Sequence, residues 1–114
     1  VRIRRDDGSW AGAGEVGEIC ARTPLAFAGY LGQPAKTAEA MQEGFFRTGD
    51  LGRVDDDGFL SYLGRAKELI ITGGINVYPA DVESAARAFP GVREALACGL
   101  PDEALGEIVG LALV

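Results

Sequence analysis

The sequence contains no histidine, only two lysines and two cysteines, and no long apolar run. Without histidine, the chain by itself cannot form a Ser-His-Asp triad, a Cys-His pair or a histidine-rich metal site. No apolar run approaches the roughly 20 residues of a membrane-spanning helix, and no signal-peptide pattern opens the chain. We therefore expect no transmembrane segment and a cytoplasmic location.

The balance of charge argues against nucleic acid as a partner. Eleven basic and seventeen acidic residues give a formal net charge of −6, whereas nucleic-acid binding needs a basic surface that displaces counterions. The content of 47% hydrophobic and 25% charged residues is typical of a globular domain. Cys20 and Cys98 form no CxxC pair, which predicts small buried residues in a reducing compartment. A disulfide between them is the alternative.

The two ends of the chain have the character of a piece of a larger protein. The sequence starts at Val1 and stops within the apolar run GEIVGLALV, which is typical of a strand. An apolar strand at the end of such a piece could pair its edge with a second copy, so self-association is expected to be possible.

The first half of the chain predicts strands separated by turns. VRIRR alternates apolar and basic residues as an exposed strand would, and VGEICAR predicts another strand. Pro34 suits the first turn of a short helix in PAKTAEAM. GFFRTGDLGRVDDDGFLSYLGR predicts short strands with turns between them. Within it, DDDG is a hairpin signal, because Asp-Gly suits a turn with positive φ.

The second half changes its hydrophobic period. ELIIT predicts a short buried strand, and an apolar stripe then follows helical spacing from Pro79 onward. The stripe consists of Val82, Ala85, Ala86 and Phe89. VREALACGL and EIVGLALV predict two further strands joined by the turn PDEALGE.

These elements predict an α+β fold: a β-rich section followed by a small β-sheet with a packed helix. The character of the sequence changes between Gly64 and Glu68. We therefore expect residues 1–65 to close one domain and residues 66–114 to open another.

Two familiar motifs do not fit their surroundings. GAGEVG at residues 12–17 matches GxGxxG, but a strand and a proline follow it instead of the helix that a dinucleotide site requires. DDDG could suggest a calcium loop, but Arg53 and Gly64 fall where that loop needs carboxylate ligands. Both stretches are interpreted as turns.

A dense set of polar and glycine positions remains in RTGDLGR, LGRAKELI and TGGINVYPADVE. Asp50, between two glycines, could accept hydrogen bonds from neighbouring hydroxyls such as those of a ribose, and Arg65 could bind phosphate oxygens. Gly73 and Gly74 let the backbone approach a ligand closely. The structural alternatives are a turn-capping Asp50, a solvated Arg65 and Lys67, and a plain glycine loop.

The order and spacing of these motifs resemble the adenylate-forming superfamily, which includes acyl-CoA synthetases, peptide-synthetase adenylation domains and luciferase-like enzymes. GEVGEI and GYLGQPAKT are similar to the end of the family's large N-terminal domain. FFRTGDLGRVDDDGFLSYLGRAKELIITGGINVYPADVE resembles two of its late motifs, and FPGVREALACGLPDEALGEIVGLALV the opening of its small C-terminal domain. The peptide-synthetase domains usually carry Asp at the hinge, so Lys67 and GGINVYP favour medium- and long-chain acyl-CoA and related carboxylate–CoA ligases.

The resemblance implies a role for six residues. Asp50 would bind the ribose hydroxyls of ATP, and Arg65 would contact the ribose or phosphate. Lys67 would be the hinge between the two domains. Gly73, Gly74 and Asn76 would lie in the loop that lines the pantetheine tunnel of coenzyme A, although Asn76, Tyr78 and Glu83 also have a purely structural interpretation.

The implied enzyme is an AMP-forming acid–thiol ligase that uses ATP with Mg²⁺, a carboxylic acid and coenzyme A. The family's phosphate-binding loop is absent from this sequence, and its adenylation lysine would lie beyond Val114, so we expect no catalytic residue here and no activity from the chain alone. The alternatives are a stand-alone binding module without catalysis and an adenylation unit that loads a carrier protein.

Overall fold

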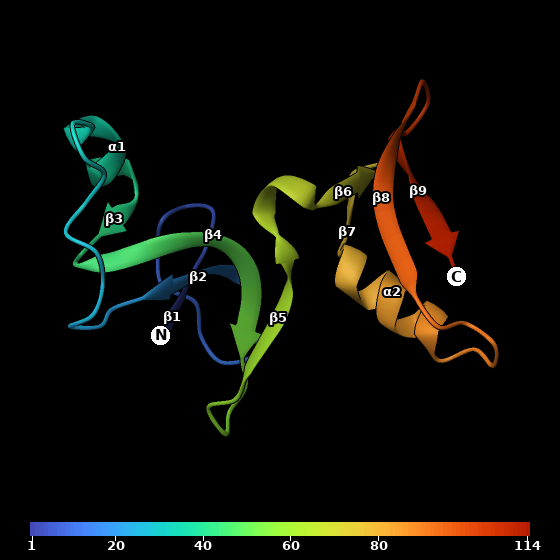
Figure 1. Cartoon of the computed structure of the whole chain (residues 1–114), viewed down its shortest axis with the longest axis horizontal. Helices are drawn as coiled ribbons and strands as arrows, with labels where there is room; N and C mark the ends of the chain where they lie inside the picture. The colour runs from blue at the N-terminus through green and yellow to red at the C-terminus, as the bar shows by residue number, and fades with distance from the viewer. The chain divides into compact units, whose positions relative to one another are not determined.

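The computed structural model describes all 114 residues, which divide into two compact units, Val1–Tyr62 and Leu63–Val114 (Figure 1). Each unit contains an antiparallel sheet, and only two α-helices occur in the chain. The α+β fold expected from the sequence is therefore confirmed. The expected domain boundary after residue 65 and the hinge at Lys67 stay predictions.

The first unit is built on a five-stranded sheet in the order β1-β2-β4-β3, with β5 also paired to β4; the residues of β5 after Tyr62 are assigned to the second unit. The strands are β1 (Arg2–Arg4), β2 (Gly17–Ala21), β3 (Met41–Gln42), β4 (Phe45–Val54) and β5 (Leu60–Arg65), and helix α1 spans Pro34–Glu39. Strand β4 corrects the expectation of several short strands, because its ten residues continue through the glycines of RTGDLG.

The core of the first unit is small and lies where β1, β2 and β4 meet. Its buried apolar side chains are Ile3, Ile19, Cys20 and Phe45. The Trp10 ring packs on Phe45 with 5.2 Å between ring centroids, and the Arg2 guanidinium lies 4.1 Å from the Trp10 centroid. Ile3 is only 3% exposed, so β1 has one buried position and is not the fully exposed strand that VRIRR suggested.

The hairpin predicted at DDDG connects β4 to β5. One carboxylate oxygen of Asp55 accepts hydrogen bonds from the backbone N–H groups of Asp57 and Phe59, at 3.1 Å and 2.8 Å. Gly58 adopts a φ of +87°, the conformation for which glycine is favoured. The carboxylate therefore caps the turn, and the hairpin predicted from the Asp-Gly pair is confirmed.

The second unit contains a four-stranded sheet in the order β7-β6-β9-β8. Its elements are β6 (Ile70–Thr72), β7 (Ile75–Val77), β8 (Ala95–Asp102), β9 (Gly106–Leu113), the helix α2 (Pro79–Arg87) and a single 3₁₀ turn, η1 (Ala66–Glu68). Strands β8 and β9 form a regular hairpin from Ala95↔Leu113 to Asp102↔Gly106. Strand β7 is an addition, because the sequence predicted no strand between the Gly73-Gly74 pair and Pro79.

Helix α2 packs on β8 through small side chains and one carboxylate. Ala86 and Ala97 are both buried, and Glu83 accepts a hydrogen bond from the Ala97 backbone N–H at 3.0 Å. The helix ends before Phe89, which is 66% exposed. The predicted stripe is therefore correct up to Ala86, and its last member lies outside the helix.

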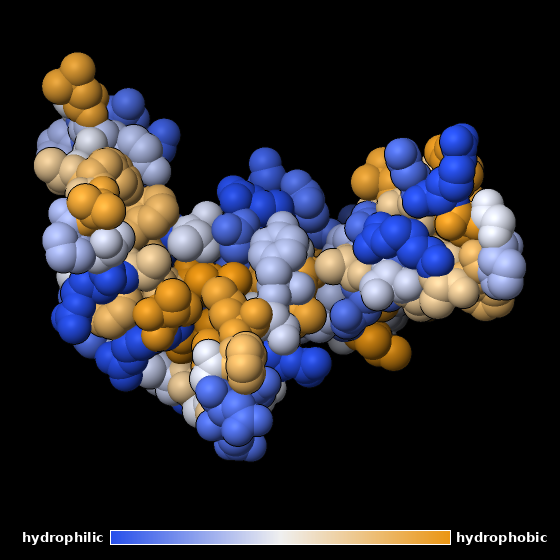
Figure 2. Space-filling view, turned by 60° about the horizontal axis from the view of Figure 1, so that its bottom comes forward, coloured by the Kyte–Doolittle hydropathy of each residue, from blue (hydrophilic) through white to orange (hydrophobic).

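Many large apolar side chains remain at the surface, where they form patches between polar areas (Figure 2). In the second unit, Val82, Phe89, Leu111 and Leu113 line an apolar groove between α2 and β9. None of the helices has the length and apolar character needed to cross a membrane.

Gly17 is a position where the sheet leaves no room for a side chain. A Cβ atom built there would lie 2.3 Å from the backbone oxygen of Arg4, in the neighbouring strand β1. We predict that Gly17→Ala lowers the free energy of unfolding by about 1–3 kcal/mol, because backbone in a paired strand cannot move aside easily. Urea denaturation of both forms measures this change.

The matched control is Gly12→Ala, whose Cβ would meet only the Glu15 side chain, at 3.4 Å. An equal loss of stability in both variants would contradict the steric explanation.

The two cysteines are free thiols in different environments. Burial is the main cause that raises the pKa of the Cys20 thiol above its usual value, and the nearby Glu18 carboxylate adds to it. Cys98 is exposed, so the expectation of two buried cysteines is wrong for this residue.

We predict that iodoacetamide at pH 8 alkylates Cys98 in the native chain and Cys20 only after denaturation, because the thiolate is the nucleophile. Peptide mass spectrometry locates the label; prompt native labelling of Cys20 would contradict the burial.

Candidate functional site

The RTGD segment forms a bulge in β4. Opposite it on β2, the register passes from Glu18↔Leu51 to Cys20↔Arg47. One residue of β2, Ile19, therefore faces the three residues Thr48–Asp50 of β4. Such bulges interrupt the ladder and change the direction in which a side chain points. The half-buried Asp50 is the last residue of this bulge.

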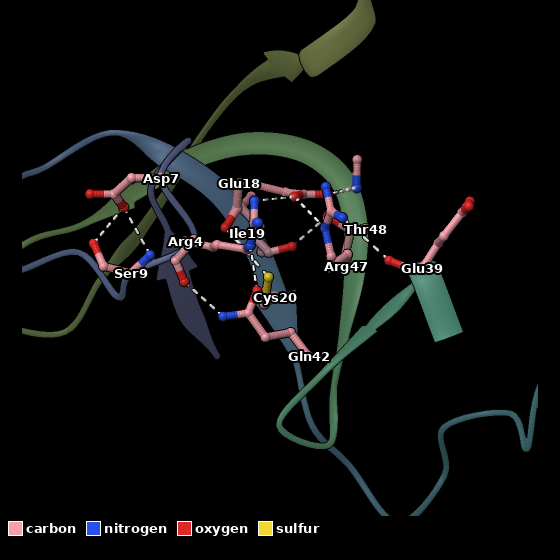
Figure 3. A network of polar contacts seen from close by, with 12 residues as sticks. Arg4, Asp7, Ser9, Glu18, Ile19, Cys20, Glu39, Gln42, Arg47 and Thr48 are labelled. Atoms are coloured by element: carbon pink, nitrogen blue, oxygen red, sulfur yellow. Dashed lines mark hydrogen bonds and ion pairs between the residues drawn. The ribbon is translucent and has the colours of Figure 1, made fainter. Parts of the chain in front are cut away.

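Side chains on both strands hold the bulge in place (Figure 3). The Thr48 hydroxyl donates to the Ile19 backbone oxygen at 2.8 Å and accepts from the Asp50 backbone N–H at 3.0 Å. The Gly49 backbone N–H donates to the Glu18 carboxylate at 3.1 Å. Gly49 has a φ of +75°, so a glycine suits the middle of the bulge.

Arg65 and Lys67 lie on either side of the start of η1. Arg65 is the last residue of β5 and is half-buried. Lys67 is exposed in the middle of η1 and lines a shallow pocket with Ile70, Ala97 and Glu107.

The Gly73-Gly74 pair is the two-residue turn of the β6–β7 hairpin, flanked by the pair Thr72↔Ile75. Both glycines have positive φ, +55° and +82°, the backbone conformation of a type I′ turn. The Gly73 N–H donates to the Leu105 backbone oxygen at 2.9 Å. A Cβ at Gly74 would have no atom within 4 Å, so the turn is open on that side.

Asn76 follows in β7, opposite Ile71, and is exposed. The second unit thus brings Gly73, Gly74 and Asn76 into one hairpin. Asp50 belongs to the first unit, and Arg65 and Lys67 to the second.

The GAGEVG stretch is a turn closed by its own glutamate, as expected. The Gly12 backbone N–H donates to the Glu15 carboxylate at 2.6 Å, and this bond is the main cause that lowers the pKa of Glu15. A loop amide bound to an internal carboxylate is a poor phosphate donor, because a phosphate would have to displace that charge.

The network also contains a residue that the motif search did not single out. Glu18 contacts both the bulge and Arg47, through hydrogen bonds of 3.1 Å and 2.8 Å. VGEICAR, which contains this residue, predicted only a strand. The pairing of β2 with β4 brings Glu18 close to Gly49, and a local stretch of sequence does not show that pairing.

No protein-family model matches the chain. Among curated proteins, it is 44% identical over 114 residues to the long-chain-fatty-acid–CoA ligase FadD13 of Mycobacterium tuberculosis. This alignment covers 100% of this chain and 22% of FadD13. It is 47% identical over 96 residues to the fatty acid–[acyl-carrier-protein] ligase ScoC of Streptomyces coeruleorubidus. This alignment covers 84% of this chain and 18% of ScoC.

Solved structures agree with this result. The amide bond synthetase McbA of Marinactinospora thermotolerans superimposes with a TM-score of 0.94 at 40% identity, over 99% of this chain and 23% of that one. ATP-bound MatB of Rhodopseudomonas palustris superimposes with a TM-score of 0.92 at 41% identity, over 98% and 23%.

The chain spans about a fifth of the length of the relatives it matches. Nearly all of its residues align with acyl-CoA ligases and related adenylate-forming enzymes, so these enzymes are its homologues and the chain is a partial match to them.

Proposed function

We propose that this chain is a segment of an ATP-dependent carboxylate–CoA ligase. The observation that carries the proposal is the alignment of 94–100% of the chain with several enzymes named as CoA ligases or synthases. The α+β fold supports it, since structures of related enzymes match 98–99% of the chain with TM-scores of 0.86 to 0.94. In such an enzyme, a carboxylate attacks the α-phosphate of ATP to give acyl-AMP and pyrophosphate, and the coenzyme A thiolate then displaces AMP.

Asp50 is proposed to hold the nucleotide by accepting hydrogen bonds from the ribose hydroxyls. A bulge that carries a half-buried carboxylate suits this role, because it gives the side chain a defined direction. Arg65 is proposed to contact the ribose or a phosphate oxygen. We assign no metal ligand to this chain, in which no group of three or more His, Cys, Asp and Glu is suited to a metal ion; Mg²⁺ would accompany the ATP.

Lys67 is proposed as the hinge, and Gly73, Gly74 and Asn76 as the loop beside the pantetheine arm of coenzyme A. The β6–β7 turn fits a thin ligand, because a side chain at Gly74 would point into open space that the glycine leaves free. Rotation about a hinge would let one cleft serve both half-reactions.

A second candidate function differs from the first in the acceptor of the acyl group. ScoC is named as a carrier-protein ligase and McbA as an amide bond synthetase, and both match most of this chain. Adenylation of the acid would be shared, whereas the nucleophile of the second step would differ. Assays of the intact enzyme with coenzyme A, a phosphopantetheinyl carrier protein and an amine decide between these acceptors.

A non-catalytic module is the alternative from another class. Sequencing the coding DNA on both sides of this segment separates the two: a Ser/Thr/Gly-rich phosphate loop upstream and a lysine downstream support the ligase. Stop codons on both sides would leave the chain without those groups, and its isolated form would then be expected to bind nucleotide weakly and to catalyse neither step. A cytoplasmic location and self-association of the isolated chain stay predictions.

The ribose role of Asp50 predicts a specific loss in the adenylation step. In the intact enzyme, Asp50→Ala should raise the KM for ATP roughly 10- to 100-fold, the loss expected for hydrogen bonds to a charged group. Acid-dependent ATP–pyrophosphate exchange measures this change. Asp56→Ala, in the exposed β4–β5 turn, is the matched control, and an unchanged KM in Asp50→Ala would remove the assignment.

The hinge role of Lys67 predicts unequal effects on the two steps. Lys67→Pro fixes φ at its own position and disfavours the helical conformation of Ala66, so rotation should be restricted. Thioester formation should fall at least about 10-fold more than adenylate formation, as expected for a conformational step. Lys67→Ala removes the charge but keeps the backbone free and is the control. Equal losses in the two steps, measured by single-turnover assays, would contradict a hinge.

A further inference from the structure

We propose that Glu18 is a positioning residue that holds the Thr48–Asp50 bulge and thereby sets the direction of the Asp50 carboxylate. This inference rests on the proposed role of Asp50 in nucleotide binding. Glu18 lies on β2, thirty-two positions before Asp50 in the sequence, and reaches the bulge only because β2 pairs with β4.

The bulge needs partners that the strand ladder does not supply. Three residues of β4 face a single residue of β2, so the regular backbone pairing is interrupted there. Three side-chain bonds replace it: the Asp50 N–H donates to the Thr48 hydroxyl at 3.0 Å, the Thr48 hydroxyl donates to the Ile19 backbone oxygen at 2.8 Å, and the Gly49 N–H donates to Glu18 Oε1 at 3.1 Å. The first bond lies within the bulge, and the other two join the bulge to β2. Only the bond from Glu18 binds a backbone N–H of the bulge to the neighbouring strand.

The two oxygens of Glu18 have different partners. While Oε1 accepts from Gly49, Oε2 accepts from Arg47 Nε at 2.8 Å and lies 3.9 Å from Arg4 Nη1. The Glu18 side chain is only 13% exposed, so the two guanidinium groups compensate its charge where water cannot do so fully. Charge-assisted bonds of this kind are short and directional, and they restrict the rotation of the carboxylate.

The arginines that orient Glu18 are themselves held. Arg4 donates from Nε to the Gln42 side chain, whose amide donates to the Gly8 backbone oxygen at 2.7 Å. Arg47 also donates to the Glu39 backbone oxygen at 3.3 Å. Figure 3 shows this chain of contacts, which runs from β1 through Glu18 to β4. A carboxylate that is hydrogen-bonded to Arg47 and attracted by Arg4 through one oxygen presents its other oxygen to Gly49 in one orientation.

The two strands could be joined by Glu18 for stability alone. The positioning role differs because it predicts a higher KM for ATP in a variant that still folds, and a loss of stability does not explain such a change. Glu83 offers a matched control in the second unit: its carboxylate also accepts from a backbone N–H, that of Ala97, at 3.0 Å and lies 3.7 Å from an arginine, Arg87. Glu83 bonds to β8 rather than to β4.

The first measurement uses this chain. By NMR hydrogen exchange, Glu18→Ala should accelerate exchange of the Gly49 and Asp50 amides at least about 10-fold relative to the amides of β1, because an opened bond exposes the amide to water. Glu18→Gln has only one acceptor oxygen for the Gly49 N–H and the Arg47 Nε–H, so its NH₂ group must face one of these donors, and exchange at these amides should be accelerated in this variant too. Exchange of Gly49 and Asp50 that is unchanged in Glu18→Ala would overturn the proposal.

The second measurement uses the intact enzyme and the KM for ATP in pyrophosphate exchange. Glu18→Ala should raise this KM roughly 10-fold, since small misplacement of a binding group is costly. Glu18→Gln, which lacks one of the two acceptor oxygens, should raise it as well, and Glu83→Ala should leave the KM unchanged. In the Asp50→Ala background, Glu18→Ala should add little, because it acts through Asp50.

The outcomes separate the two levels of the proposal. If Asp50→Ala itself leaves the KM unchanged, the ribose role of Asp50 fails. If Asp50→Ala raises the KM but Glu18→Ala does not, or if the two effects multiply in the double variant, the positioning role of Glu18 fails while the function of Asp50 stands. If Glu18→Ala does not fold, Glu18→Gln and Glu18→Asp replace it: the shorter Asp cannot reach Gly49 and must raise the KM.

Discussion

Strand β2 pairs with β1 on one side and with β4 on the other, so the sheet of the first unit depends on β2 to join β1 to the remaining strands. Its apolar residues Ile19 and Cys20 supply half of the unit's buried core. Its polar atoms, the Glu18 carboxylate and the Ile19 carbonyl, bind the bulge of β4. Ile19 and Cys20, as neighbours in a strand, point to opposite faces, so the same five residues serve both packing and the positioning of the bulge.

Carboxylates that accept from backbone N–H groups recur where regular pairing stops. Glu18 does so at the β4 bulge, Glu83 between α2 and β8, and Glu107 between β9 and the Ile71 N–H, at 2.9 Å. Each satisfies a donor that would otherwise depend on water. In a chain with small cores, such bonds define how one element meets the next. These three acidic residues therefore have a structural role.

The sequence predicted the elements that depend on neighbouring residues. The DDDG hairpin follows from an Asp-Gly turn, and α2 from Pro79 and an apolar stripe at helical spacing. Strand β7 was missed because Ile75–Val77 is too short to show a period, and its pairing with β6 depends on the turn between them. For the long β4, the sequence predicted several short strands. A glycine in a bulge and a glycine in a turn give the same sequence signal, and the glycines of β4 were assigned to turns.

The sequence by itself indicated the relationship to adenylate-forming enzymes and the α+β class, because the motif residues lie close together along the chain and keep their spacing. It also supplied the candidate site residues, whose roles stay predictions. Only the tertiary structure decided that Gly73 and Gly74 form a hairpin turn, that Cys98 is exposed, and that Asp50 ends a bulge. It alone connected Glu18 to that bulge, since the contact joins residues about thirty positions apart through strand register. Register is set by the packing of whole strands, and no local stretch of sequence contains it.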